Sequence, residues 1–270
     1  FENPFVNEDR AIELFDTAEQ RALAYEIACQ SMVLLKNDGT LPINPKGLTI
    51  GLIGPNANSS RCMFGDYSYA AVTELLKVLP DENSAFQTLT EDEAQKLFPL
   101  TPTLLEAFRK KYPENEILFA EGCGIKSDDE SGFPKAVEVA LSADIIILAL
   151  GGRSGLAPYC TTGEFRDSTD LSLPGVQEKL AHLITDLGKP VVIVNLNGRP
   201  TAFGELSDKV NAILQAWVPG EEGGRAIVAT LMGEVNPGGR LPISIPHSGG
   251  QVPVYYNHKP SGMKSNIYGD

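Results

Sequence analysis

The residues best suited to chemistry lie in a polar segment between positions 163 and 174. It carries one glutamate, one arginine and two aspartates: Glu164, Arg166, Asp167 and Asp170. A carboxylate on a loop beyond a buried strand can lie in a dry cleft, where its pKa rises and it can act as a general acid at neutral pH. For the two aspartates we favour a structural role, as partners of Arg166 or as caps of the next helix. For Glu164, spacing alone leaves a structural and a catalytic role open.

Other kinds of site find little support in the sequence. Gly51-Leu-Ile-Gly54-Pro-Asn lacks the three-glycine spacing of a dinucleotide site, and Pro55 removes a backbone donor that a pyrophosphate would need. A Walker-type phosphate loop is absent, and Ser154 misses the frame of a serine-hydrolase elbow. The four cysteines and three histidines do not have the spacing of zinc ligands. We therefore expect no cofactor and no metal.

The charge balance excludes two classes of partner. The 270 residues include 22 basic and 35 acidic side chains, a net charge of -13. Nucleic-acid phosphates and anionic membrane surfaces would both repel such a chain. The longest apolar run is about eight residues, too short to cross a membrane. We therefore expect neither nucleic acid nor membrane as a partner, whereas neutral small molecules such as sugars are compatible with this charge.

The elements that must position the candidate residues alternate between strands and helices. Short apolar runs predict strands at 48–53, 117–120, 145–150, 191–196 and 212–217, with an edge strand at 252–256. Helical patterns fall at 18–36, 102–111, 134–141, 174–187 and 221–232, and 81–96 is expected to be an inserted loop or short helix. Continuous apolar runs suit strands covered on both faces, so the alternation predicts a doubly wound, mostly parallel sheet. Ligands of such sheets bind beyond the carboxyl ends of the strands, where the 163–174 segment falls.

A series of motifs in order along nearly the whole chain resembles the second domain of glycoside hydrolase family 3. They are Ser31-Met-Val-Leu-Leu-Lys36, Ile53-Gly-Pro-Asn-Ala57, Gly65-Asp-Tyr67, Cys160-Thr-Thr-Gly-Glu-Phe-Arg-Asp167, Leu171-Ser-Leu-Pro-Gly-Val-Gln177, Asn197-Gly-Arg-Pro200, Trp217-Val-Pro-Gly-Glu-Glu-Gly-Gly224 and Asn236-Pro-Gly-Gly-Arg-Leu-Pro242. The resemblance implies an α/β sandwich over residues 18–260, with a six-stranded, mostly parallel sheet that has one antiparallel edge strand. Residues 1–17 are expected to be a linker from a preceding barrel domain, and 261–270 a tail.

The resemblance also implies roles for individual residues. Glu164 matches the general acid/base, which this domain lends to an N-terminal (β/α)8 barrel that carries the nucleophilic aspartate. Tyr67 matches an aromatic that can border the leaving-group side of the substrate. Asp66, beside it, and Arg153 and Arg166, which flank the loop, complete the expected substrate-binding set.

The implied function is that of a retaining β-glycosidase acting on terminal β-linked glucose or xylose. Retention requires the two carboxyl groups to lie about 5–5.5 Å apart. The barrel is absent from these residues, so we expect the 270 residues alone to lack the nucleophile and to be inactive. The alternative is a non-catalytic carbohydrate-binding or regulatory module that binds glycans through Tyr67 and Tyr69.

Overall fold

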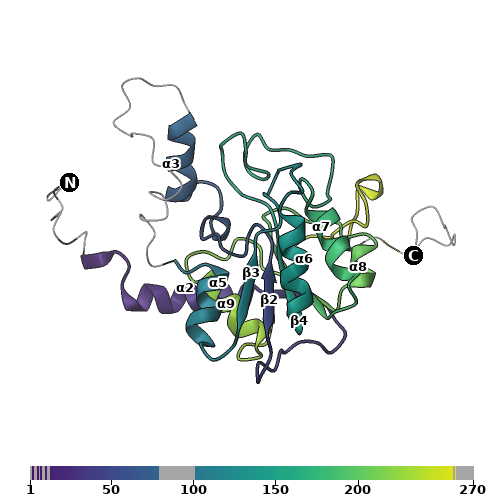
Figure 1. Ribbon diagram of the computed structural model, residues 1–270. Helices are drawn as coiled ribbons and strands as arrows, with labels where there is room; N and C mark the ends of the chain where they lie inside the picture. The colour runs from purple at the N-terminus through teal and green to yellow at the C-terminus, as the bar shows by residue number, and fades with distance from the viewer. Residues whose placement is uncertain are drawn as a thin grey trace.

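The computed structural model describes residues 13–78 and 101–257, together with isolated positions near the two ends of the chain. Its centre is a six-stranded sheet with helices on both faces (Figure 1). The strands are β1 (Val33–Asn37), β2 (Ile50–Ile53), β3 (Ile117–Ala120), β4 (Ile145–Gly151), β5 (Val191–Leu196) and β6 (Ala212–Gln215). In space they follow the order β1-β6-β5-β4-β2-β3. All neighbouring pairs are parallel except β1 and β6, which confirms the predicted sheet with one antiparallel edge strand.

Two helical layers cover the sheet. One layer consists of α2 (Ala18–Ser31), α5 (Leu104–Lys111) and α9 (Gly223–Leu231), and the other of α6 (Phe133–Ser142), α7 (Gln177–Thr185) and α8 (Leu206–Lys209). A separate hydrophobic core lies between the sheet and each layer. The remaining helices of the described residues are α3 (Tyr69–Val78) and the 3-10 turns η1 (Arg61–Met63) and η2 (Gly249–Gln251).

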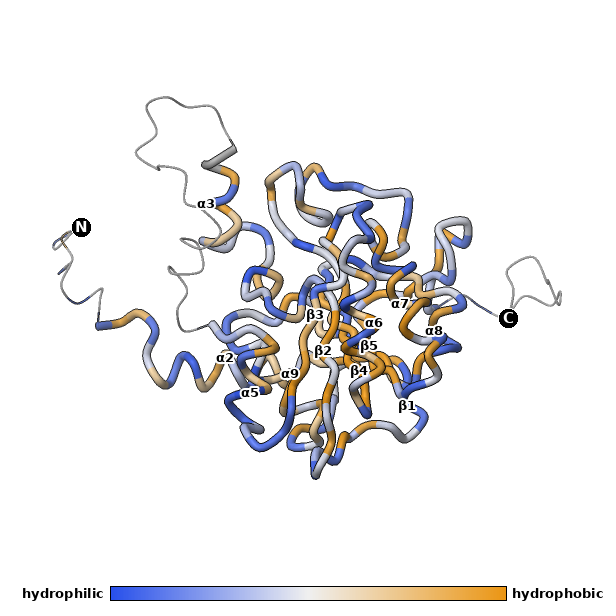
Figure 2. The backbone as a smooth tube through the Cα atoms, viewed as in Figure 1, coloured by the Kyte–Doolittle hydropathy of each residue, from blue (hydrophilic) through white to orange (hydrophobic). Residues whose placement is uncertain are grey.

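The central strands supply side chains to both cores. Ile147 lies between Leu52 of β2 and Val192 of β5 in register, and all three face the α2–α5–α9 layer. Its neighbours Ile146 and Leu148 point to the opposite core, as the two-residue period of a strand requires. Figure 2 shows the resulting concentration of hydrophobic residues along the strands. This two-sided burial explains why these strands are continuous apolar runs in the sequence.

Two helices begin with a reciprocal cap. The Thr17 hydroxyl accepts from the Gln20 amide, and the Gln20 side chain accepts from the Thr17 amide. Thr103 and Glu106 form the same arrangement at the start of α5. Each pair satisfies backbone donors that the first turn of a helix leaves without partners, and so fixes where the helix starts.

The long first helix expected over 18–36 is wrong in its last five residues. The helix ends at Ser31, Met32 is extended, and Val33–Asn37 form β1, which pairs with β6. The apolar residues after Ser31 therefore complete the sheet rather than a helical stripe. Leu23 and Ile27 of the helix are more than half exposed.

The expected edge strand at 252–256 is also wrong. The chain there forms no strand, and Val252, Tyr255 and Tyr256 are exposed. Pro253 lacks the N–H that a ladder needs, and the antiparallel edge position is taken by β1 instead. The expected insertion at 81–96 lies outside the described residues.

The four cysteines are free and buried. Burial raises the pKa of the Cys62 thiol to about 12 and, together with the nearby charge of Glu121, raises that of Cys123 to about 11. Because the thiolate is the reactive form, these side chains are inert at neutral pH.

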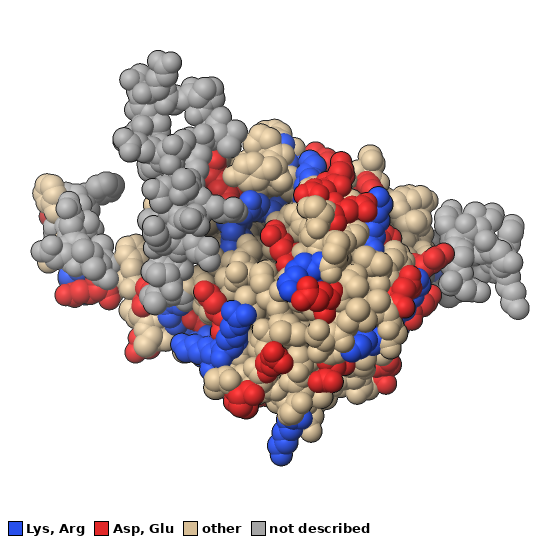
Figure 3. Space-filling view, in the orientation of Figure 1, with Lys and Arg blue, Asp and Glu red and all other residues tan. Residues whose placement is uncertain are grey.

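Acidic and basic side chains are interspersed with neutral residues on the face seen in Figure 3. Within the part of the chain that the structure describes, no helix is long and apolar enough to span a bilayer.

The end of β4 generates a test of the fold. Gly151 has φ +131°, and a Cβ placed there would lie 2.2 Å from the Leu196 carbonyl oxygen of β5. We expect Gly151→Ala to lower the free energy of unfolding by more than about 2 kcal/mol, measured by urea denaturation. The matched control is Gly188→Ala, where φ is +72° and space is open, so only the backbone cost of about 1 kcal/mol applies. Equal losses in the two variants would contradict this account of the strand end.

Candidate active site

The site forms where loops follow the carboxyl ends of β2 and β4. The β4 loop folds back on itself, because the Thr161 amide donates to the Arg153 carbonyl and the Gly155 amide to the Thr162 carbonyl. Ser154 and Thr162 form an isolated parallel bridge within it. Because the loop folds back in this way, residues 163–166 lie beside the loop that follows β2.

Glu164 lies exposed on this loop and is held from the β2 loop at two points. Its backbone amide donates to Asp66 Oδ2 at 2.9 Å. Its Oε2 accepts a hydrogen bond from the Tyr67 phenol. The carboxylate therefore faces solvent while both its backbone and its side chain are oriented by residues almost a hundred positions earlier.

Asp66 uses both carboxylate oxygens within the chain. Oδ2 accepts from the Glu164 amide, and Oδ1 accepts from the Ser154 hydroxyl. The carboxylate thus joins three points of the two loops. Its place as an expected substrate-binding residue stays a prediction, but the contacts that the structure gives it are to the chain itself.

Tyr67 is 65% exposed and has a left-handed backbone, with φ +60°. Its pKa lies above the usual value of a phenol, chiefly because its hydroxyl donates to the Glu164 carboxylate. Partial burial and the charges of Glu164 and Asp66 add to this shift, since a phenolate beside two carboxylates is disfavoured. An exposed aromatic face beside the acidic group suits a carbohydrate ring.

The two arginines of the expected set have partners within the domain. Arg153 lies 3.8 Å from Glu74, and its guanidinium stands 5.6 Å from the centre of the Tyr159 ring. Arg166 donates to the carbonyls of Leu156 at 2.8 Å, Ala157 at 3.1 Å and Phe165 at 3.1 Å. Both arginines shape the loop from within, and substrate contact by either stays a prediction.

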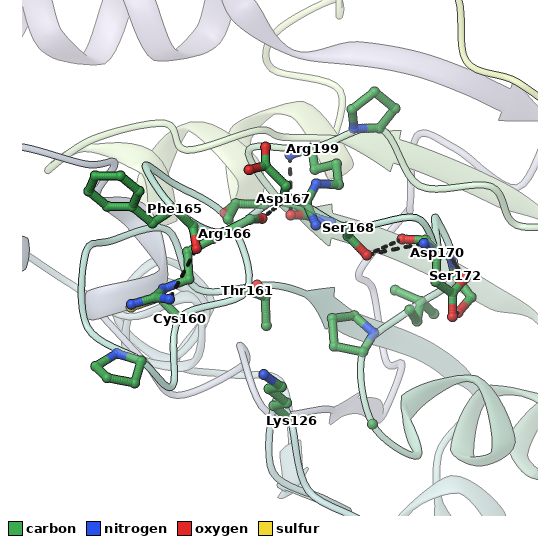
Figure 4. A pocket seen from close by; sticks show the side chains of 17 residues that line it. Lys126, Cys160, Thr161, Phe165, Arg166, Asp167, Ser168, Asp170, Ser172 and Arg199 are labelled. Carbon is green, nitrogen blue, oxygen red and sulfur yellow. Dashed lines mark hydrogen bonds between the residues drawn. The ribbon is translucent and has the colours of Figure 1, made fainter. Parts of the chain in front are cut away.

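A cavity of about 400 Å³ opens beside the loop, beyond β4 and β5 (Figure 4). Phe165, Arg166 and Asp170 lie on its wall, with Lys126 and Arg199 contributing cationic groups. It therefore has a mixed lining of charged, polar and apolar side chains next to the candidate acidic residue.

The structural roles expected for the two aspartates differ from what is observed. The Asp170 carboxylate accepts from the amide and hydroxyl of Ser172, and these bonds lower its pKa. It does not cap α7: the helix begins at Gln177, its N-cap residue is Val176, and no side-chain hydrogen bond caps it. Arg166 binds backbone carbonyls rather than Asp167 or Asp170 in the contacts that the structure describes.

Two residues of the site had no role in the sequence analysis. Ser154, there a plain loop residue, is buried and donates to Asp66, 88 positions earlier. Glu74, on α3, binds Arg61 at 2.8 Å and lies near Arg153. The Ser154–Asp66 and Glu74–Arg153 contacts have no local spacing signal, because each joins the segment after β2 to the loop after β4. Among the described residues, no group of three or more His, Cys, Asp or Glu side chains is placed to hold a metal ion.

The fold and this loop pair define a class of protein: a doubly wound α/β domain with an exposed glutamate at the carboxyl edge of its sheet. The family model described as "Glycosyl hydrolase family 3 C-terminal domain" matches residues 32–269, and the chain belongs to that family.

Individual relatives agree with this assignment. A β-xylosidase from Formosa agariphila is 35% identical over 252 residues, which is 92% of this chain and 31% of the relative. A periplasmic β-glucosidase from Salmonella typhimurium is 36% identical over 251 residues, 91% of this chain and 31% of the relative. The solved β-glucosidase from Listeria innocua in complex with isofagomine superposes with a TM-score of 0.74 at 28% identity, covering 96% of this chain and 31% of that one. The chain thus spans about a third of the length of these proteins.

The contact between Tyr67 and Glu164 can be tested by titration. We expect the Tyr67 phenol to deprotonate above the usual tyrosine pKa, and Glu164→Gln to lower that pKa because the neighbouring negative charge is removed. NMR of tyrosine labelled at the ζ carbon, assigned with Tyr67→Phe, measures the value. Asp129→Asn should leave it unchanged, because Asp129 is not among the charges that act on Tyr67. An identical Tyr67 titration with and without the Glu164 charge would show that the two groups do not interact.

Proposed function

We propose that this chain is the second domain of a retaining β-glycosidase that removes terminal β-linked glucose or xylose, and that Glu164 is its general acid/base. The observation that carries the proposal is the placement of Glu164: exposed at the carboxyl edge of the sheet, with its amide held by Asp66 and its carboxylate held by Tyr67. A proton donor that serves a substrate held by another domain must protrude in this way, yet keep a fixed orientation.

The chemistry needs one carboxyl group in two protonation states. Glu164 as acid gives its proton to the glycosidic oxygen while a second carboxylate attacks the anomeric carbon, so the leaving group departs as an alcohol and a glycosyl ester forms. Glu164 as base then takes a proton from the water that breaks this ester. The Tyr67 phenol donates to Oε2 and so fixes the orientation of the carboxyl group that both steps use.

The second carboxylate would come from a preceding barrel domain. The relatives that this chain matches are about three times longer, which leaves room for such a domain. In the assembled enzyme the two carboxyl groups would lie about 5–5.5 Å apart, the separation of retaining enzymes. Covering of the exposed Glu164 by that domain would also remove the water that a general acid must exclude.

The substrate class is supported by the relatives. Those named above are a β-xylosidase and a β-glucosidase, and one related solved structure is a Listeria innocua β-glucosidase in complex with glucose. Tyr67 and Tyr69 are both exposed, and in the proposed enzyme their rings would offer aromatic faces to the substrate. The same two rings would serve a non-catalytic carbohydrate-binding module, which predicts binding without turnover.

The acid/base role has a direct test in the full-length protein. We expect Glu164→Gln to lower kcat/KM for an alkyl or disaccharide β-glycoside by about 10²–10⁴-fold, because the leaving group is no longer protonated. Azide, which needs no general base, should restore turnover of an activated aryl glycoside and yield the β-glycosyl azide. Glu121→Gln, another exposed glutamate just beyond a strand end, is the matched control and should keep full activity. Unchanged turnover in Glu164→Gln would remove the residue from the mechanism and leave the binding-module alternative.

The second expectation concerns the 270 residues by themselves. Expressed alone, they should fold but show no turnover of aryl β-glucosides or β-xylosides, since the proposed nucleophile belongs to another domain. Circular dichroism gives the folding control, and a sensitive fluorogenic assay gives the activity. Hydrolysis abolished by Glu164→Gln in this isolated chain would show that the nucleophile lies within it.

A further inference from the structure

We infer that Asp66 is a positioning residue for the acid/base, acting as a clamp that fixes the backbone of Glu164 rather than as a contact for the sugar. This inference rests on the proposed function of Glu164. The clamp consists of the Asp66 carboxylate, the Ser154 hydroxyl and the Glu164 amide.

The hydrogen bonds are divided between the two carboxylate oxygens. Oδ1 accepts from Ser154, at the start of the β4 loop, and Oδ2 accepts from the amide of Glu164, at its far end. The Ser154 side chain is buried, so this end of the clamp is held in the interior of the domain. One side chain from the β2 loop therefore fixes both arms of the folded-back β4 loop.

Gly163 lets the carboxylate come close enough. Its φ is +128°, and a Cβ added there would lie 2.5 Å from Asp66 Oδ2 and 2.5 Å from the Gly155 carbonyl oxygen. Asp66 thus packs directly against the Cα that precedes the acid/base. Any larger residue at this position would displace the carboxylate from the Glu164 amide.

The clamp holds backbone that would not adopt this form by itself. Tyr67, next to Asp66, and Phe165, next to Glu164, both have φ +60°. Aromatic residues are uncommon in this left-handed region, and they persist there only where surrounding bonds determine them. The hydrogen bond between Asp66 and Glu164 lies between these two residues and joins the turns that contain them.

The role separates cleanly from a contact with sugar. Each oxygen of Asp66 accepts one hydrogen bond from the chain, so loss of the side chain would misplace the Glu164 proton donor, whereas loss of a sugar contact would slow substrates whatever their leaving group. Misplacement of a proton donor matters only where the leaving group needs a proton. A dinitrophenolate leaves without taking up a proton, whereas an alcohol or sugar leaving group needs one.

The experiment compares two substrates in the full-length protein. For a β-disaccharide, Asp66→Ala should lower kcat/KM by about 10²-fold, the cost of misplacing a catalytic group by roughly 1 Å. For the 2,4-dinitrophenyl glycoside, kcat/KM should change by less than about threefold, because that step needs no proton. The control is Asp129→Ala: this aspartate also accepts from one backbone amide and one serine hydroxyl, but within the loop that follows β3, and both substrates should turn over normally.

Two further variants keep the test decisive even if Asp66→Ala does not fold. Asp66→Asn can retain the clamp, with its oxygen accepting from the Glu164 amide and its NH2 group donating to Ser154 Oγ. It should therefore stay within about tenfold of the wild type on the disaccharide, as expected for the loss of a charge-assisted bond. Ser154→Ala removes only one bond of the clamp and should show the same selectivity for leaving group in weaker form.

The outcomes are distinguishable. Equal losses on both substrates in the Asp66 and Ser154 variants, or unchanged kinetics, would overturn the clamp while a large effect of Glu164→Gln leaves the proposed function standing. Equal losses in Asp66→Asn and Asp66→Ala would assign the effect to charge and also overturn it. Full activity of Glu164→Gln would remove the proposed function itself, and with it the role of Asp66.

Discussion

The arrangement of this domain depends on one constraint: its five parallel strands all end at the same edge of the sheet. Each loop that follows a strand must therefore turn back at that edge, and loops far apart in sequence meet there. Close packing at the strand ends requires glycine, as the approach of Gly151 to the Leu196 carbonyl demonstrates. The meeting of the β2 and β4 loops, and every contact of Glu164 with Asp66 and Tyr67, follows from this convergence.

The exposure of Glu164 means that this domain orients the carboxylate but does not shield it from solvent. The domain supplies orientation, through hydrogen bonds to the amide and to one carboxylate oxygen, but it leaves the carboxylate in solvent. General acids are usually tuned by burial as well as by neighbours. In the proposed enzyme, positioning comes from this domain, and exclusion of water comes from the domain that holds the sugar. The arginines nearest the loop serve its internal structure, since Arg166 binds three backbone carbonyls.

The parts predictable from sequence are those with a local cause. The strands at 145–150 and 191–196 are apolar because both faces are covered, and their pattern predicts them correctly. The stretch after Ser31 was assigned to a helix because apolar residues can satisfy either period, and only pairing with β6 decides in favour of a strand. Glu164 was selected by its motif, whereas Ser154 was not, because its partner Asp66 lies 88 positions earlier. Contacts across such separations form only once the sheet is assembled, so the sequence contains no residue spacing that would predict them.

The chemistry of the four thiols carries a practical consequence. All are sequestered in the interior, and for Cys62 and Cys123 the anionic form is strongly disfavoured at neutral pH. A single cysteine introduced on the solvent side of the β4 loop would thus be the reactive sulfur in a background of silent ones. Such a chain would accept a fluorophore or spin label at one chosen point without prior removal of its native cysteines, so that the approach of a partner domain could be followed by spectroscopy in real time.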